Sequence, residues 1–207
     1  SMLAYWLTEL GQKNIVGLEK SSVIPSDIAS TAHASDFVYN TTHDKLGCWT
    51  TDFSRRFYED NGFFLKKGGL EICRKDDDAR WEELKRKVSS GKAFGTNVSL
   101  ISAAEAKEKF PLLDEESIRG AMWDPDAGLV TPRSQDVVSF AVETAKDKGA
   151  LRTFTNTPAV DFEVENDRIV GVKTDKGTIK TNKVVIASGI WGPLMGDKAG
   201  VGVPLMP

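Results

Sequence analysis

Apolar and polar positions alternate along the chain with two different periods, and the first stretch shows both. Apolar residues between Leu3 and Leu10 recur at the spacing of one helix face, which predicts a helix over residues 3–10. The apolar run 15–18 is too short for a helix and is bounded by polar residues, which predicts a buried strand. Glu19 then stands at the carboxyl end of this strand.

The middle of the chain changes from a polar loop to a mixture of helical and strand patterns. Residues 21–41 hold few apolar anchors and predict a loop of functional length, which a helix over about 42–60 follows. Strand-like alternation over 63–74, broken by a bulge or turn at 68–69, opens a region that also carries helical patterns. Residues 62–129 therefore predict a mixed insert rather than repeated strand and crossover units.

Two further helices are marked by their capping residues. Ser102 and Glu105 have the spacing of a capping box, which predicts a short helix. Thr131 is expected to cap a longer helix that closes at Gly149.

The last part of the chain predicts strands. Three short strands joined by tight turns lie within residues 151–181 and predict a β-meander. The apolar run 183–187 predicts a second buried strand, followed by a turn of small residues. We expect the runs 15–18 and 184–187 to pair in parallel.

Composition and charge exclude several classes of protein. The 207 residues carry 27 basic and 30 acidic side chains without a long basic run, so neither a nucleic-acid nor a membrane partner is expected. No apolar stretch approaches the ~20 residues that span a bilayer, and the N-terminus does not resemble a signal peptide. Cys48 and Cys73 lack the spacing of a metal site or a disulfide framework. We therefore expect a cytoplasmic protein without a metal.

Seven short motifs occur in an order and spacing typical of one protein family. They are Leu18-Glu19-Lys20, Ser30-Thr31-Ala32-His33-Ala34, Gly68-Gly69-Leu70-Glu71, Pro111-Leu112-Leu113-Asp114, Gly128-Leu129-Val130, Gly171-Val172-Lys173-Thr174 and Ala187-Ser188-Gly189-Ile190-Trp191. Together they make nearly the whole chain resemble the D-amino-acid-oxidase-like superfamily of FAD-dependent oxidoreductases. The resemblance is greatest to its dimethylglycine and sarcosine dehydrogenase or oxidase branch.

This resemblance implies an α/β fold. Residues 1–61 and 130–207 would form part of a parallel FAD/NAD(P)-binding sheet of the two-dinucleotide-binding type, with a β-meander. Residues 62–129 would form an inserted α+β segment of the substrate or cap domain. Such a sheet needs a Gly-x-Gly-x-x-Gly turn between its first strand and first helix, where backbone amides meet the pyrophosphate. The sequence contains no such turn, so we expect the first strand and its turn to be missing through truncation, a gene-model error or design.

The resemblance also implies a set of cofactor-binding residues, beginning with the end of the first predicted strand. In such sheets a carboxylate at the tip of the second strand accepts hydrogen bonds from the ribose hydroxyls of the adenosine half. Glu19 is placed for this role, and Lys20 belongs to the same motif. The alternative is an ordinary solvated acid at a strand end.

A histidine motif is expected along the flavin. In this branch the Ser-Thr-x-His-Ala stretch lies along the flavin, and its histidine is commonly bonded to the 8α-methyl carbon. His33 would be that attachment residue, since a neutral imidazole nitrogen can attack this carbon in the flavin's electrophilic tautomer. Ser30 and Thr31 have hydroxyls and amides suited to phosphate or ribityl oxygens. This sequence departs from the branch at the position before Ser30, where Ala29 stands in place of the usual glycine. A non-covalent flavin, an ordinary hydrogen-bonded loop histidine and polar capping residues remain alternatives.

Three later residues complete the expected cofactor site. Val160 matches the position whose backbone meets the adenine edge, and the alternative is a plain core valine. Gly189 and Trp191 match the turn that meets the pyrophosphate side of the cofactor, where a bulky side chain at position 189 would push the contact away. The sequence assigns no catalytic base.

The implied activity is FAD-dependent oxidation of a secondary or tertiary amino acid, such as an N-methylglycine, by hydride transfer to the flavin. The expected partner is this small-molecule substrate. Exposed strand edges also favour a homo-oligomer or a covering partner segment. Two alternatives stay open: a catalytically silent regulatory relative, and a fragment that binds no cofactor.

Overall fold

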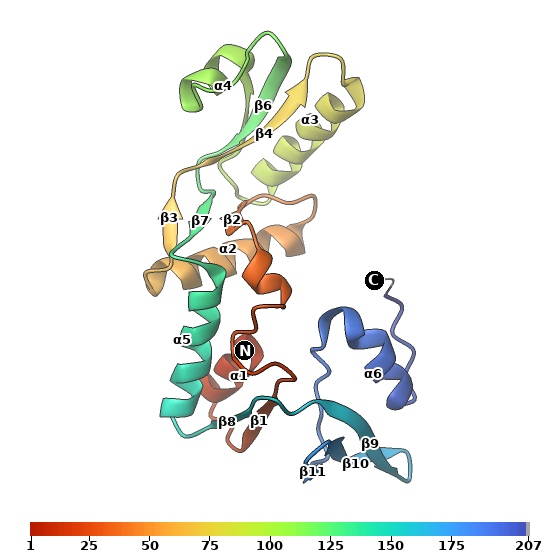
Figure 1. Ribbon diagram of the computed structural model, residues 1–207. Coiled ribbons are helices and arrows are strands. Elements are labelled where there is room, and N and C mark those ends of the chain that lie inside the picture. The colour runs from red at the N-terminus through yellow and green to blue at the C-terminus, as the bar shows by residue number, and fades with distance from the viewer. Residues whose placement is uncertain (206–207) are drawn as a thin grey trace. The chain divides into compact units, whose positions relative to one another are not determined.

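The computed structural model describes residues 1–205 and has a mixed α/β fold (Figure 1). The chain divides into two compact units, one made of Ser1–Ala32 with the chain from Val138 onward, the other of His33–Val137. The sequence placed the divisions at 61/62 and 129/130 instead. The assignment of an FAD-binding domain and a substrate-domain segment stays a prediction. Within residues 1–205, no helix has the length and apolar character to cross a membrane.

A small parallel sheet and two helices make one half of the first unit. The elements are α1 (Met2–Glu9), β1 (Ile15–Leu18), β8 (Leu151–Phe154) and α5 (Ser134–Asp147), whose first residues belong to the second unit. β1 and β8 pair in parallel over four residues. Val142, Ala145 and Leu151 are buried between the helix and the sheet, because α5 presents its apolar stripe to β8.

An antiparallel meander and a short helix make the other half of the first unit. The elements are β9 (Ala159–Glu165), β10 (Arg168–Thr174), β11 (Gly177–Lys180), the 3₁₀ helix η2 (Gly189–Trp191) and α6 (Gly192–Lys198). Phe162 and Val172 of the meander are buried against Met195 of α6, and Leu18 of β1 packs on the same cluster. The predicted β-meander is therefore confirmed, and it is packed against the end of β1.

The second unit contains two three-stranded antiparallel sheets. One has the strand order β2 (Phe37–Val38), β7 (Gly128–Val130), β3 (Phe64–Lys66); the other has the order β4 (Gly69–Arg74), β6 (Ile118–Asp124), β5 (Ser99–Ser102). The helices are α2 (Lys45–Asp60), α3 (Asp78–Ala93) and α4 (Ala103–Lys109). Leu84 and Val88 of α3 are buried against Met122 of β6. The predicted capping box of Ser102 and Glu105 is present in full at the start of α4.

Three predictions about strands are wrong. Residues 183–187 form no strand, and Val185 is 66% exposed. β1 pairs in parallel with β8, a strand that the sequence analysis missed, and not with 184–187. A run such as Val-Val-Ile has a high strand propensity, but a strand forms only where a neighbour completes its hydrogen bonds, and no strand within residues 1–205 does so here. β1 itself is half-buried rather than buried.

The predicted start of the helix that Thr131 was expected to cap is also wrong. α5 begins at Ser134 and not at Thr131. A carboxylate far away in the sequence caps it: Asp36 Oδ1 accepts hydrogen bonds from the amide of Ser134 at 2.9 Å and from its hydroxyl at 2.6 Å. A side chain that reaches the first turn of a helix from another segment satisfies the same free amides as a local cap.

Candidate cofactor site

Glu19 follows β1 directly and is held there by its backbone. Its amide donates to the carbonyl of Phe154 at 2.9 Å, and its carbonyl accepts from the amide of Thr157 at 2.9 Å. The carboxylate atom Oε1 accepts from the amide of Ser21 at 2.8 Å, while Oε2 has no hydrogen-bond partner within residues 1–205. The side chain is thus oriented at the carboxyl end of a parallel strand, with one oxygen available to a ligand.

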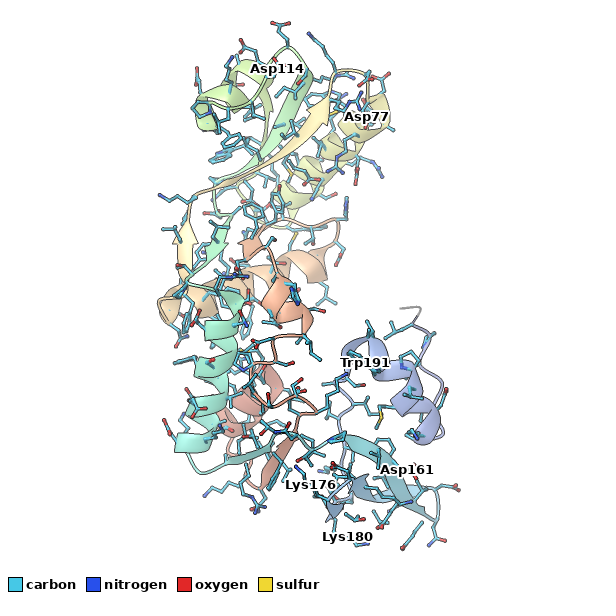
Figure 2. All side chains as sticks on the ribbon, in the orientation of Figure 1. Asp77, Asp114, Asp161, Lys176, Lys180 and Trp191 are labelled. Carbon is cyan, nitrogen blue, oxygen red and sulfur yellow. The ribbon has the colours of Figure 1, made fainter. Side chains whose placement is uncertain are left out.

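Lys20 joins this strand end to the turn that begins at Gly189. The ammonium nitrogen of Lys20 lies 3.3 Å from the centroid of the Trp191 ring, in a cation–π contact. Trp191 is 43% exposed and stands where η2 meets α6 (Figure 2). The structure therefore brings Lys20, which follows Glu19 directly, into contact with the predicted turn, within one compact unit.

The turn itself has open space and an unsatisfied hydroxyl. Gly189 has a φ of +56°, and a Cβ added there would have no heavy atom within 4 Å. Glycine is favoured by this backbone conformation and leaves room beside it. The Oγ of the preceding Ser188 is buried without a hydrogen-bond partner in the described part of the chain. An open glycine turn, an orphaned hydroxyl and a free carboxylate oxygen suit a ligand rich in hydroxyls and phosphate oxygens, such as the adenosine diphosphate half of a dinucleotide.

Val160 lies in β9 and is 41% exposed. The plain core-valine alternative is therefore wrong, because the side chain is not part of the buried cluster below the meander. Its backbone role toward an adenine ring stays a prediction.

The histidine motif forms the 3₁₀ helix η1 (Ser30–His33). Ser30 and His33 are exposed, and neither side chain has a hydrogen-bond partner within residues 1–205. His33 is therefore not the loop histidine with a satisfied hydrogen bond that the sequence analysis gave as the alternative, within the described residues. Ser30 and Thr31 belong to the first compact unit, and His33 begins the second.

The sequence analysis missed the contacts that fix the segment after His33. Asp36 Oδ2 accepts from Nε of Arg133 at 2.6 Å, in addition to the two bonds from Ser134 to Oδ1. Burial alone raises the pKa of Asp36, but the hydrogen bonds from Ser134 and Arg133 outweigh it and hold the pKa below its ordinary value. No local sequence signal pointed to these contacts, because Asp36 lies 98 residues before Ser134.

No metal site accompanies these residues in the described part of the chain: no group of three or more histidine, cysteine or carboxylate side chains could hold an ion there.

The chain matches known proteins along its whole length. A model of the family described as "DAO: FAD dependent oxidoreductase" matches residues 1–207. The chain is 29% identical to the mitochondrial sarcosine dehydrogenase of Homo sapiens, over 98% of this chain and 22% of that protein. It is 25% identical to the mitochondrial pyruvate dehydrogenase phosphatase regulatory subunit of Mus musculus, over 94% of this chain and 22% of that protein.

A solved structure has the same fold. The crystal structure of L-proline dehydrogenase from P. horikoshii matches with a TM-score of 0.86 and 29% identity, over 97% of this chain and 52% of that one. The chain thus spans 22% of the length of the two curated relatives and about half of the solved structure.

Proposed function

Because this chain belongs to the DAO family of FAD-dependent oxidoreductases, we propose that its full-length protein oxidises a secondary or tertiary amino acid, such as an N-methylglycine, with FAD as cofactor. The observation that carries the cofactor part is the oriented carboxylate of Glu19, whose neighbour Lys20 contacts Trp191 in the turn that begins at Gly189. The substrate class rests on the similarity to sarcosine dehydrogenase, which extends over 98% of this chain.

In this proposal the first compact unit holds the adenosine half of FAD. Oε2 of Glu19 accepts a hydrogen bond from a ribose hydroxyl, while the Ser21 amide keeps the carboxylate in place. The Lys20–Trp191 contact holds the turn beside the strand end. Gly189 leaves space for pyrophosphate oxygens to approach the backbone, and the exposed Val160 borders the adenine.

The segment η1 serves the flavin half. His33 is the attachment residue, since its exposed ring has both nitrogens free of protein hydrogen bonds within residues 1–205. The hydroxyls of Ser30 and Thr31 bind ribityl or phosphate oxygens. When bound, FAD would supply the hydride acceptor for oxidation of the neutral amine at its α or N-methyl carbon. The chain's own part is to bind and orient the cofactor.

The test is the absorbance spectrum of the purified full-length protein, before and after addition of sarcosine or dimethylglycine. The proposal expects a yellow protein whose flavin band bleaches with one of these amines under anaerobic conditions. Flavin that remains with the protein after acid precipitation, and is released in His33→Ala, supports attachment at His33. A colourless protein that takes up no added FAD would contradict the proposal.

One observation favours a second candidate function. The similarity to a phosphatase regulatory subunit covers 94% of this chain, so a catalytically silent regulatory protein of the same family is the alternative. Such a protein leaves every tested amine unoxidised, whether or not it binds FAD. The amine-bleaching experiment therefore separates the two functions.

We also propose that another segment or a second copy covers the open side of the small sheet. Within residues 1–205, β1 pairs only with β8, and the apolar run 183–187 is unpaired and largely exposed. Unpaired strand edges favour association. Size-exclusion chromatography with light scattering on the full-length protein measures its oligomeric state. A strictly monomeric protein would rule out the second copy and leave a covering segment of the same chain.

A further inference from the structure

The carboxylate of Asp36 is saturated by contacts from one short segment about a hundred residues away. Oδ1 accepts from the amide and the hydroxyl of Ser134, at 2.9 and 2.6 Å, and Oδ2 accepts from Nε of Arg133 at 2.6 Å. The side chain of Asp36 is only 11% exposed. A largely buried carboxylate with three such donors is rigidly placed, since turning it would leave each donor unsatisfied.

The backbone of the same segment is tied to the same place. The Asp36 carbonyl accepts from the amide of Val130 at 2.7 Å, and β2 then pairs with β7 from Phe37 onward. Nη2 of Arg133 also donates to the carbonyl of Ala34, the residue after His33, at 3.4 Å. Asp36 has a φ of +60°. Residues other than glycine rarely adopt this left-handed conformation, but aspartate tolerates it better than most. The chain is therefore fixed at both Ala34 and Asp36.

A helix cap alone does not account for this arrangement. The cap needs only the bonds from Ser134 to one carboxylate oxygen, whereas Arg133 occupies the other oxygen and reaches back to Ala34. The additional contacts lie on the histidine side of Asp36. His33 itself has no protein partner in the described residues, so its placement depends on the chain that follows it.

We propose that Asp36 is a positioning residue for His33: together with Arg133 and Ser134 it fixes residues 34–36 against the start of α5 and so presents the imidazole at a defined place. This inference rests on the proposed function, in which His33 meets the flavin. Asp36 touches neither substrate nor cofactor in this proposal and acts only through the segment that it anchors.

The experiment compares Asp36→Asn with Asp27→Asn in the full-length protein. The first substitution turns an amide group toward Arg133 or Ser134 and removes the charge of the carboxylate. Asp27 is exposed in the preceding loop and has no hydrogen-bond or ion-pair partner within residues 1–205. Two quantities are measured: hydrogen exchange of the peptide that covers residues 33–38, and the ratio of acid-stable to total bound flavin. We expect exchange to become roughly tenfold faster in Asp36→Asn. The flavin ratio should fall, and Asp27→Asn should match the wild type.

Arg133 provides a second route if Asp36→Asn fails to fold. Arg133→Gln removes the guanidinium but leaves the Ser134 cap. Arg133→Lys keeps the charge but offers a single donor nitrogen in place of the separate Nε and Nη2 that bond Asp36 and Ala34. The inference expects Gln to accelerate exchange in 33–38 and to lower the flavin ratio, with Lys intermediate. A merely structural role would lower the melting temperature without changing the flavin ratio.

The outcomes separate this inference from the proposed function. If the wild type binds no flavin, the proposed function fails, and faster exchange confined to 33–38 still supports the anchor. If the wild type holds flavin only non-covalently, the proposed covalent attachment at His33 is wrong. Hydrogen exchange in residues 33–38 then still decides whether Asp36 anchors this segment. Exchange in 33–38 that is the same in Asp36→Asn, Arg133→Gln and the wild type would overturn the inference.

Discussion

The ammonium nitrogen of Lys20 lies 3.3 Å from the centroid of the Trp191 ring, so a residue at the end of the first strand contacts a turn near the C-terminal end of the described chain. The contact joins two segments that the sequence placed in one cofactor site on the basis of separate motifs. Leu18, which packs on the meander core, also ties the end of β1 to this part of the unit. The two sides of the proposed adenosine site therefore meet through these side chains.

Removing either partner of the Lys20–Trp191 contact should destabilise the first compact unit. A partly exposed cation–π contact contributes about 0.5–1 kcal/mol, so the coupling between Lys20→Ala and Trp191→Ala should have this size. Urea unfolding of the two single variants and the double variant measures it. Lys13→Ala is the matched control, because Lys13 is exposed and has no partner within residues 1–205. A coupling energy of zero would mean that the two side chains do not interact in solution.

Glu19→Gln should weaken FAD binding by the full-length protein. A charged carboxylate forms stronger hydrogen bonds to ribose hydroxyls than a neutral amide, and a hydrogen bond to a charged group contributes about 1.5–3 kcal/mol. The expected loss in affinity is therefore roughly tenfold to a hundredfold, measured by titration of the apoprotein with FAD. Glu108→Gln, at an exposed position of α4, serves as control. Equal affinity in both variants would remove Glu19 from the proposed site.

The stability of the second compact unit should depend on pH through Asp36. Its pKa is lowered in the folded protein from an ordinary value of 3.8, so its stabilisation is fully present above that value and is lost as the pH falls through the lower folded pKa. At pH 7, Asp36→Asn should lower the free energy of unfolding by about 1.5–3 kcal/mol. The difference from the wild type should shrink as the pH falls below about 4. Urea unfolding at several pH values tests this, and a difference independent of pH contradicts it.

Gly68→Ala should destabilise the second unit strongly. Gly68 has a φ of +74°, and an added Cβ would overlap the ring of Trp123. The left-handed conformation and the overpacked ring together should cost about 2–5 kcal/mol. Gly202→Ala is the control, since a Cβ there meets no heavy atom within 4 Å and the backbone is not left-handed. Thermal unfolding compares them, and equal melting temperatures would show that the turn at 68–69 rearranges freely.

Several elements, and the family, could be predicted from the order of residues because their signals are local. The helix that ends at Asn61-Gly62, the capping box of Ser102 and Glu105 and the meander all depend on residues a few positions apart, and the structure confirms each of them. The ordered motifs identified the family correctly, as the family match over residues 1–207 confirms. This was possible because the motifs are read from the sequence and do not depend on how the strands pair.

The meeting of distant segments became known only from the folded chain. The sequence analysis paired 15–18 with 184–187, but β8 completes the hydrogen bonds of β1. It placed a cap at Thr131, but Asp36 satisfies the amide of Ser134 from 98 residues away. Strand partners and long-range caps are chosen by which free donors and acceptors the fold brings within hydrogen-bonding distance, and no local pattern of residues contains that information.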